Sequence, residues 1–393
     1  MTVEMDDTDK LKVLYEDAVK HFGMTFEPPD VNRGMYRFEP VTDKVIRYGL
    51  GAIKGTGQQA IEAMIAAREG RGEGPQGDKT GPFTSLFDFC VRVDKARMNK
   101  RTVEALIKAG AFDAIQMNRA ALVASIDRAF EFAAATLANA NQGGLFDMMG
   151  EDAHGSSTQE PDLVDITPWG IKERLTQEKT AVGFYLSGHL FDEVALEVRR
   201  FVRTQIDELG DSREPQILAG IVSDFRVING QRGRLALFKV DDKSATIEAS
   251  ADETVFNANK DALKDDEFVV ISGRLQLDHF SGGLRVKVLQ AWNLAAARAK
   301  FGRYLQVALG DSLPDVNRLV REFPAHRQET EHGETLVHGL RVRMGVRCKA
   351  EQGAAVAELQ LGEASRFFPS DAALAAWSAQ AGSGSVSVVY DAG

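Results

Sequence analysis

The sequence predicts three folds in succession along 393 residues: an all-helical domain, a closed β-barrel and a small α/β domain. Two observations predict this order. Apolar residues recur at helical spacing through most of the first half, whereas from Gln216 onward they alternate at the period of strands. The final part alternates between the two patterns. Because the chain is too long for one compact core, several domains are expected.

The first half is expected to be mainly helical. Ser85 and Asn99 have the side chains that cap helix N-termini, so a helix should follow each. Residues 69–82 are rich in glycine and charge, which predicts a flexible loop. The expected helices cover residues 8–22, 58–69, 85–90, 99–107, 118–139, 171–182 and 191–201.

The second half begins with a strand pattern. Asn229-Gly230 and Ser281-Gly282-Gly283 supply the turn residues that hairpins require. A helix is expected at 253–263, between the third and fourth strands, and that order is typical of an OB-fold barrel. The expected strands cover residues 217–225, 234–241, 244–249, 267–275 and 284–292.

The last part alternates strand, helix, strand, strand, helix, strand. This order predicts a small ferredoxin-like α/β domain. The expected strands cover residues 304–309, 339–346, 354–361 and 386–390, and the expected helices cover 313–323 and 370–379.

Composition narrows the class of protein. A net charge of −10 and a pI near 5.4 argue against a protein that coats nucleic acid, so local basic stretches must carry any DNA contact. Arg92 to Arg101 and Arg226 to Lys243 are such stretches, with solvated faces as the alternative. No apolar run reaches the roughly 20 residues of a membrane span, so a cytoplasmic protein is expected. Cys90 and Cys348 lack metal-ligand spacing and are interpreted as core residues.

A glycine-rich turn precedes the helix expected at 58–69 and resembles a helix-hairpin-helix element. Its glycines let a phosphate approach the free amides of the helix N-terminus, which favour negative charge. A plain helical corner is the alternative, and packing is the alternative for Thr56. Leu106 to Ala111 resembles a degenerate second copy. The residues expected to contact duplex phosphates are Lys54, Gly55, Thr56, Gly57, Gln58, Lys100 and Arg101.

The expected barrel carries aromatic and basic residues suited to single-stranded DNA. OB-folds bind such strands by stacking and by charge. For Phe225, Phe238 and Phe280, core packing is the alternative. The residues expected to contact single-stranded DNA are Phe225, Arg226, Arg232, Arg234 and Lys243.

No catalytic constellation or metal site is found in the sequence. Asp241-Asp242 and Asp265-Asp266 occur in turn contexts, where solvated aspartates are usual. His189 has no partner residues of a catalytic kind. P-loop, HExxH and GxSxG motifs are absent, and no cofactor is expected in this chain.

A short apolar motif lies in a polar segment, 141–167, that is expected to be a linker. Gln142, Leu145 and Phe146 resemble the peptide with which bacterial DNA-processing proteins bind the replication sliding clamp. An apolar pair without a core to bury it is typical of a docking peptide. A hydrophobic staple that ends the preceding helix is the alternative.

Four sequence blocks together resemble the C-terminal portion of the bacterial replicative DNA polymerase III alpha subunit, a family C polymerase. They are Tyr48–Gly57, Ser85–Phe89, Leu106–Asp113 and Gly183–His189. The resemblance implies these parts: 1–45, the end of the fingers; 46–140, tandem helix-hairpin-helix; 141–167, a linker with a clamp-binding motif; 168–212, a helical connector; 213–298, an OB-fold; and 299–393, a domain like those that bind the tau subunit of the clamp loader.

The resemblance also implies partners and a missing active site. DNA, the sliding clamp beta subunit and tau are the implied partners. The family's palm aspartates and their magnesium would precede Met1, so no polymerase activity is expected from this chain alone. Leu190 stands where the family commonly has proline. A stand-alone adaptor that recruits the clamp to primed DNA, and a nuclease built on the same modules, remain the alternatives.

Overall fold

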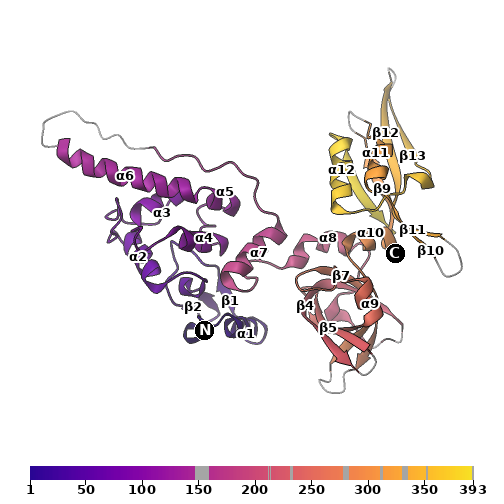
Figure 1. Cartoon of the computed structure of the whole chain (residues 1–393), viewed down its shortest axis with the longest axis horizontal. Helices are drawn as coiled ribbons and strands as arrows, with labels where there is room; N and C mark the ends of the chain where they lie inside the picture. Colours follow the sequence, from indigo (N-terminus) through magenta and orange to yellow (C-terminus); the bar gives the residue numbers. More distant parts are fainter. Residues whose placement is uncertain are drawn as a thin grey trace. The chain divides into compact units, whose positions relative to one another are not determined.

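The computed structural model describes residues 1–146, 159–210, 212, 214–230, 233–277, 283–309, 313–329, 335–350 and 353–391, without the side chains of 140–146, 230 and 346–356. The chain forms two compact units, Met1–His189 and Leu190–Gly393 (Figure 1). Among the described residues, the first unit is built around one hydrophobic core and the second around two.

The first unit is mainly helical, as expected. Ser85 and Asn99 cap α3 and α4 through bonds from the amides of Asp88 and Thr102. Three short strands, arranged β1-β3-β2, were not predicted because three or four residues are too few to show a period. The elements are η1 (Thr2–Glu4), α1 (Thr8–Lys20), β1 (Thr25–Glu27), β2 (Glu39–Thr42), β3 (Val45–Arg47), η2 (Leu50–Ala52), α2 (Gln58–Arg68), α3 (Leu86–Arg92), α4 (Lys100–Lys108), α5 (Arg119–Ala124), α6 (Ile126–Phe146) and α7 (Ile171–Val182).

Arg92 is fully buried and fixes the loop at 69–82. Its guanidinium donates to the carbonyls of Ala67, Lys79 and Gly81 at 2.8–2.9 Å, and it pairs with Asp88 at 3.2 Å. The loop that was expected to be flexible is thus bonded to a buried side chain at Lys79 and Gly81. Arg92 is neither a DNA contact nor part of a solvated face, because its charge is used inside the fold.

Helix α6 is longer than expected. It runs to Phe146 rather than about Asn139, so the backbone of Gln142, Leu145 and Phe146 is helical rather than part of the linker. Its middle contains Ala133, Ala134, Ala135, Ala138 and Ala140, and alanine has the strongest helix propensity. The fully buried Ser125 separates α5 from α6, where one continuous helix was expected.

The second unit contains the expected barrel. Its strands close in the order β4-β5-β6-β8-β7, with β6 and β8 parallel and the other pairs antiparallel. A helix between the third and fourth strands completes the OB-fold, which confirms the prediction. The elements are β4 (Gln216–Gly230), β5 (Gly233–Asp241), β6 (Thr246–Asp252), α9 (Glu253–Ala258), β7 (Phe268–Leu277) and β8 (Leu284–Trp292).

The segment before the barrel is broken into short turns. A helix was expected at 191–201, but η4 (Leu190–Glu193), α8 (Ala195–Val198) and η5 (Ile206–Glu208) occupy this region. Glu197 of α8 accepts hydrogen bonds from Arg298 and Tyr390. These bonds attach the segment to the α/β domain, so tertiary contacts prevail over local helix propensity.

The α/β domain has the expected order of strands and helices, with one added hairpin. The sheet order is β13-β12-β9-β14, and β9 pairs directly with the parallel strand β12. No strand separates them, so the split arrangement of a ferredoxin-like sheet is absent and that topology was wrong. The elements are α10 (Leu294–Phe301), β9 (Gly302–Ala308), α11 (Val316–Glu322), β10 (His326–Glu329), β11 (Thr335–His338), β12 (Arg341–Ala350), β13 (Gly353–Gln360), η6 (Glu363–Ser365), α12 (Asp371–Ala381) and β14 (Ser385–Tyr390).

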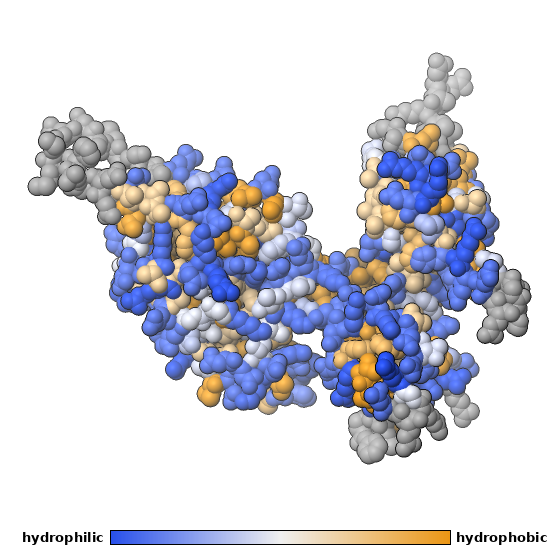
Figure 2. Space-filling model, viewed as in Figure 1, coloured by the Kyte–Doolittle hydropathy of each residue, from blue (hydrophilic) through white to orange (hydrophobic). Residues whose placement is uncertain are grey.

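Figure 2 shows hydrophilic residues over most of the visible face of each unit, with apolar side chains in separate small groups. Within the described ranges, no helix combines the length and apolar character needed to cross a bilayer.

Candidate nucleic-acid interface

The glycine turn in the first unit is held by two hydrogen bonds and faces open space. The Lys54 amide donates to the Ala181 carbonyl at 2.8 Å, and the Gly55 carbonyl accepts from the Thr102 hydroxyl at 3.2 Å. Gly55 has φ +84°, a conformation that glycine adopts at no steric cost. A side chain at Gly55 or Gly57 would meet nothing within 4 Å. No side chain caps α2, so its first amides are available to an anion.

A pocket of about 550 Å³ lies beside this turn. Within the part of the chain that the structure describes, Lys54 and Arg101 have no ion-pair partner, whereas Lys108 is paired with Glu104 at 2.6 Å. The uncompensated charge next to free helix amides suits a phosphate. The pocket is lined by Lys54, Gly55, Asn99, Arg101, Glu104, Ala105, Lys108, Thr180 and Ala181.

Three of the residues expected to bind duplex phosphates are engaged elsewhere. Thr56 is buried, and its hydroxyl donates to the carbonyls of Leu50 and Ile53. Gln58 donates to Glu62 at 2.7 Å, and Lys100 pairs with Asp127 of α6. The structure therefore brings together Lys54, Gly55 and Arg101. The side chains of Thr56 and Lys100 are bonded to other groups of the protein instead.

The second hairpin differs from the first in what fills its turn. Gly110 has φ +86°, and a side chain there would collide with the guanidinium of Arg119. Arg119 is buried and pairs with Asp113 at 2.6 Å and Glu178 at 3.2 Å. Burial alone would lower the pKa of Arg119, but the two carboxylates outweigh burial and raise the pKa above its ordinary value. An internal cation thus occupies the position that is open in the first hairpin.

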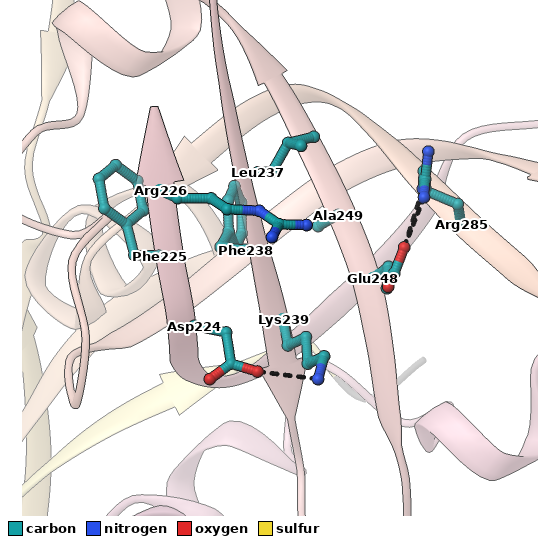
Figure 3. A pocket seen from close by; sticks show the side chains of 9 residues that line it. All are labelled: Asp224, Phe225, Arg226, Leu237, Phe238, Lys239, Glu248, Ala249 and Arg285. Atoms are coloured by element: carbon teal, nitrogen blue, oxygen red, sulfur yellow. Dashed lines mark hydrogen bonds and ion pairs between the residues drawn. The ribbon is translucent and has the colours of Figure 1, made fainter. Parts of the chain in front are cut away.

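The barrel has a groove of about 430 Å³ on its outer face, shown in Figure 3. Arg226 extends across β5, whereas the ring of Phe225 points to the other side of β4. Phe225 is half-buried and lies 6.3 Å from the ring of Phe238 and 5.6 Å from that of Phe256. The groove is lined by Asp224, Phe225, Arg226, Leu237, Phe238, Lys239, Glu248, Ala249 and Arg285.

A β-bulge produces this arrangement. Between Ser223 and Arg226, two residues of β4 face the single residue Phe238 of β5. The extra residue reverses the alternation of the strand, so Phe225 turns to the core and Arg226 to the outside. Asp224 adopts φ +53°, a left-handed conformation that aspartate tolerates better than most residues.

The charges in the groove are arranged as two ion pairs and one cation. Lys239 pairs with Asp224 at 2.8 Å, and Arg285 pairs with Glu248 at 2.6 Å (Figure 3). Arg226 is exposed, and no ion pair of Arg226 is found among the described residues. Arg226 therefore gives the groove a positive charge that no carboxylate balances.

The other residues expected to contact single-stranded DNA lie apart from the groove. Arg234 is near the start of β5 and Lys243 follows its end, so about 23 Å of strand lies between them. Lys243 pairs with Asp192 at 2.8 Å. Arg232 and Phe280 lie outside the described residues. The structure thus brings together only Phe225 and Arg226 from the expected set.

Three basic residues of the outer face were not predicted. Strand register aligns Arg226 with Leu237, Ser250, Lys287 and Arg274 in one row around the barrel. Arg274 and Lys287 are exposed. Arg285 lies two positions before Lys287 on β8, in the next outward-facing row. The sequence signal that could have indicated them is the alternation of basic residues with apolar residues along β7 and β8. Their proximity to Arg226 depends on the parallel pairing of β6 with β8, which the sequence pattern does not specify.

Asp242 is structural rather than solvated. It is buried, and its carboxylate accepts from Arg199 at 2.7 Å and from the amides of Ile206, Ser244 and Ala245. Burial alone would raise the pKa of Asp242, but these donors lower it below the ordinary value. The described residues contain no group of three or more metal-ligating side chains. Cys90 is buried as expected, which raises the pKa of its thiol to about 12.

The fold and these sites define a modular protein with helix-hairpin-helix and OB-fold domains. A family model described as a helix-hairpin-helix motif matches residues 23–122. Among solved structures, an SSB domain from Synechococcus sp. covers 21% of this chain and 98% of its own, at 17% identity and TM-score 0.19. The second OB-fold domain of replication protein A from Methanococcus maripaludis covers 23% and 93%, at 16% identity and TM-score 0.19.

Curated relatives make the relationship specific. DNA polymerase III subunit alpha of Neisseria meningitidis serogroup B is 43% identical over 329 residues, which are 83% of this chain and 27% of that protein. The Escherichia coli K12 subunit is 34% identical over 337 residues, or 84% and 28%. The expected resemblance is confirmed: this chain is a relative of the DNA polymerase III alpha subunit and matches a C-terminal portion of it. It spans about a quarter of the length of these relatives.

Proposed function

We propose that this chain is a DNA-binding region of a replicative DNA polymerase, and that the barrel groove binds single-stranded DNA. The observation that carries this proposal is Arg226, an exposed cation without an ion pair among the described residues, in a groove on the outer face of an OB-fold. OB-folds bind nucleic acid on this face of their second and third strands. The relatives, which are DNA polymerase III alpha subunits, support the proposal.

Local charge has to provide the affinity, because the whole chain is acidic. With a net charge of −10, long-range attraction to DNA is weak. A phosphate at Arg226 gains a charge-assisted contact without first breaking an ion pair. Half-buried Leu237 offers an apolar surface beside it for bases. The first hairpin, with Lys54 and Arg101, is proposed to bind duplex phosphates.

Arg226→Ala tests the groove directly. Anisotropy of a labelled oligothymidine of about 20 nucleotides should show about fivefold weaker binding to the full-length variant at about 0.1 M salt, because one phosphate contact is lost. Duplex binding should not change. Arg318→Ala, which removes an exposed arginine of α11, is the matched control and should bind like wild type. Equal affinity of Arg226→Ala and wild type would refute the proposal.

We also propose that Gln142, Leu145 and Phe146 bind the sliding clamp beta subunit, that the α/β domain binds tau, and that the protein works in the cytoplasm. The resemblance and the relatives support these proposals. Burying Leu145 and Phe146 contributes roughly 3 to 6 kcal/mol before ordering costs, which suits a weak contact.

Calorimetry with purified clamp tests the motif. Leu145→Ala with Phe146→Ala should abolish clamp binding and spare DNA binding. Leu137→Ala removes an exposed leucine earlier in α6 and should leave clamp binding unchanged. Unchanged clamp affinity in the double variant would contradict the assignment. Binding of the full chain to purified tau tests the third partner.

A further inference from the structure

The cations of the barrel groove, apart from Arg226, are held by carboxylates that also line the groove. Lys239 is paired with Asp224 and Arg285 with Glu248 (Figure 3). Strand register makes Glu248 the direct neighbour of Lys239 on one side and of Arg285 on the other. A negative charge therefore lies next to each of these cations, in a groove proposed to bind a polyanion.

Both ion pairs are open to solvent. Asp224 and Glu248 are 61% and 49% exposed, and their cations are 43% and 37% exposed. Pairs this accessible are weak, because water and salt screen both charges. A phosphate brought into the groove can therefore replace the carboxylate as the partner of Lys239 or Arg285.

We propose that Asp224 and Glu248 compete with DNA phosphates for Lys239 and Arg285 and so keep the affinity of the groove for single strands low. This inference rests on the proposed function of the groove. Arg226 makes the first phosphate contact, and each further contact requires that a carboxylate be displaced. Internal competition lets phosphate contacts exchange readily, as a protein that moves along DNA requires.

The backbone allows the competition to be removed without disturbing the groove. Asp224 lies on the bulge at φ +53°, and asparagine tolerates this conformation as well as aspartate does. Asp224→Asn therefore removes the charge and keeps the turn. Glu248→Gln does the same on β6, where the side chain is exposed and the strand is fixed by its neighbours.

The test measures oligothymidine binding to full-length variants at several salt concentrations between about 50 and 200 mM. Asp224→Asn and Glu248→Gln are each expected to bind about fivefold more tightly at about 0.1 M salt. The plot of log affinity against log salt should steepen by about 0.7, because one additional phosphate is contacted. Asp261→Asn is the matched control, since Asp261 is 96% exposed, pairs with Lys264 and does not line the groove.

Each outcome either supports or overturns the proposed competition between carboxylates and phosphates. Tighter binding and a steeper slope in the two groove variants, but not in Asp261→Asn, support the competition. Unchanged or weaker binding in the groove variants overturns it, and if Arg226→Ala still weakens binding, the proposed function stands. An equal gain in Asp261→Asn also overturns it, because net charge alone would then be the cause. Absence of binding by wild type and all variants overturns both proposals.

Discussion

The guanidinium of Arg119 lies 3.2 Å from the carboxylate of Glu178, and both side chains are buried. The other oxygen of Glu178 accepts the amides of Leu186 and Ser187 at 2.5 and 2.7 Å. One carboxylate thus connects the second hairpin to the loop at 183–189. Two of the sequence blocks behind the family resemblance, Leu106–Asp113 and Gly183–His189, are parts of this one buried network.

Glu178→Ala should destabilise the first unit by about 3 kcal/mol, because it removes one of the two carboxylates that pair with the buried Arg119 and the acceptor of the Leu186 and Ser187 amides. Urea unfolding followed by fluorescence measures this loss. Glu173→Ala, at an exposed position of the same helix, should change stability by less than about 1 kcal/mol. A loss in Glu178→Ala no greater than in Glu173→Ala would contradict this role.

Arg92→Met should release the loop at 69–82. The carbonyls of Ala67, Lys79 and Gly81 would lose their donor, and Asp88 would lose one of its two cations, at a cost of about 3 kcal/mol. Hydrogen exchange should then quicken across the loop. Arg71→Ala removes an exposed arginine of the same loop and should leave the exchange unchanged. Slow exchange retained in Arg92→Met would show that other contacts fix the loop.

The second unit should lose stability in acid through Asp242. Its folded pKa lies below the ordinary value of 3.8, so its contribution is complete above about pH 4 and is lost as the pH falls through the folded pKa. Asp242→Asn cannot titrate. The stability difference between wild type and this variant should therefore shrink as the pH falls below about 4. Urea unfolding at a series of pH values measures it, and a constant difference would contradict the assignment.

Arg101→Ala should weaken binding to a DNA duplex and leave oligothymidine binding unchanged. Losing one phosphate contact lowers the salt slope for duplex DNA by about 0.9. Lys12→Ala, which removes an exposed lysine of α1, is the control for a change of charge in the same unit. A slope for Arg101→Ala equal to that of wild type would place the duplex contact elsewhere.

The sequence predicted the succession of folds and most elements because their periods and turn residues are local signals. The strands of the barrel and helix α7 agree closely with the expected ranges. Long-range pairing was less predictable. The direct pairing of β9 with β12, which excludes the ferredoxin-like topology, joins strands separated by a helix and a hairpin.

The candidate sites were also predicted only in part, because local spacing is visible in the sequence and tertiary contacts are not. Lys54 and Gly55 precede the start of α2 in the sequence, so their position beside its first amides follows from local spacing. Arg92 and Asp242 occur in charged stretches that look solvated, and only the tertiary structure shows that both are buried. Arg226 was named from a basic stretch after the expected strand 217–225, but its outward direction depends on the bulge at Asp224 and Phe225.

Hydrogen exchange of the full chain with and without oligothymidine tests the central claim most directly, because it locates the bound strand without a substitution. Slower exchange should appear in peptides that cover Ser223–Ile228 of β4 and Leu237–Asp241 of β5, and the α/β domain should be unaffected. Protection confined to the α/β domain or to the first unit, with none in β4 and β5, would contradict the assignment of the groove to single-stranded DNA.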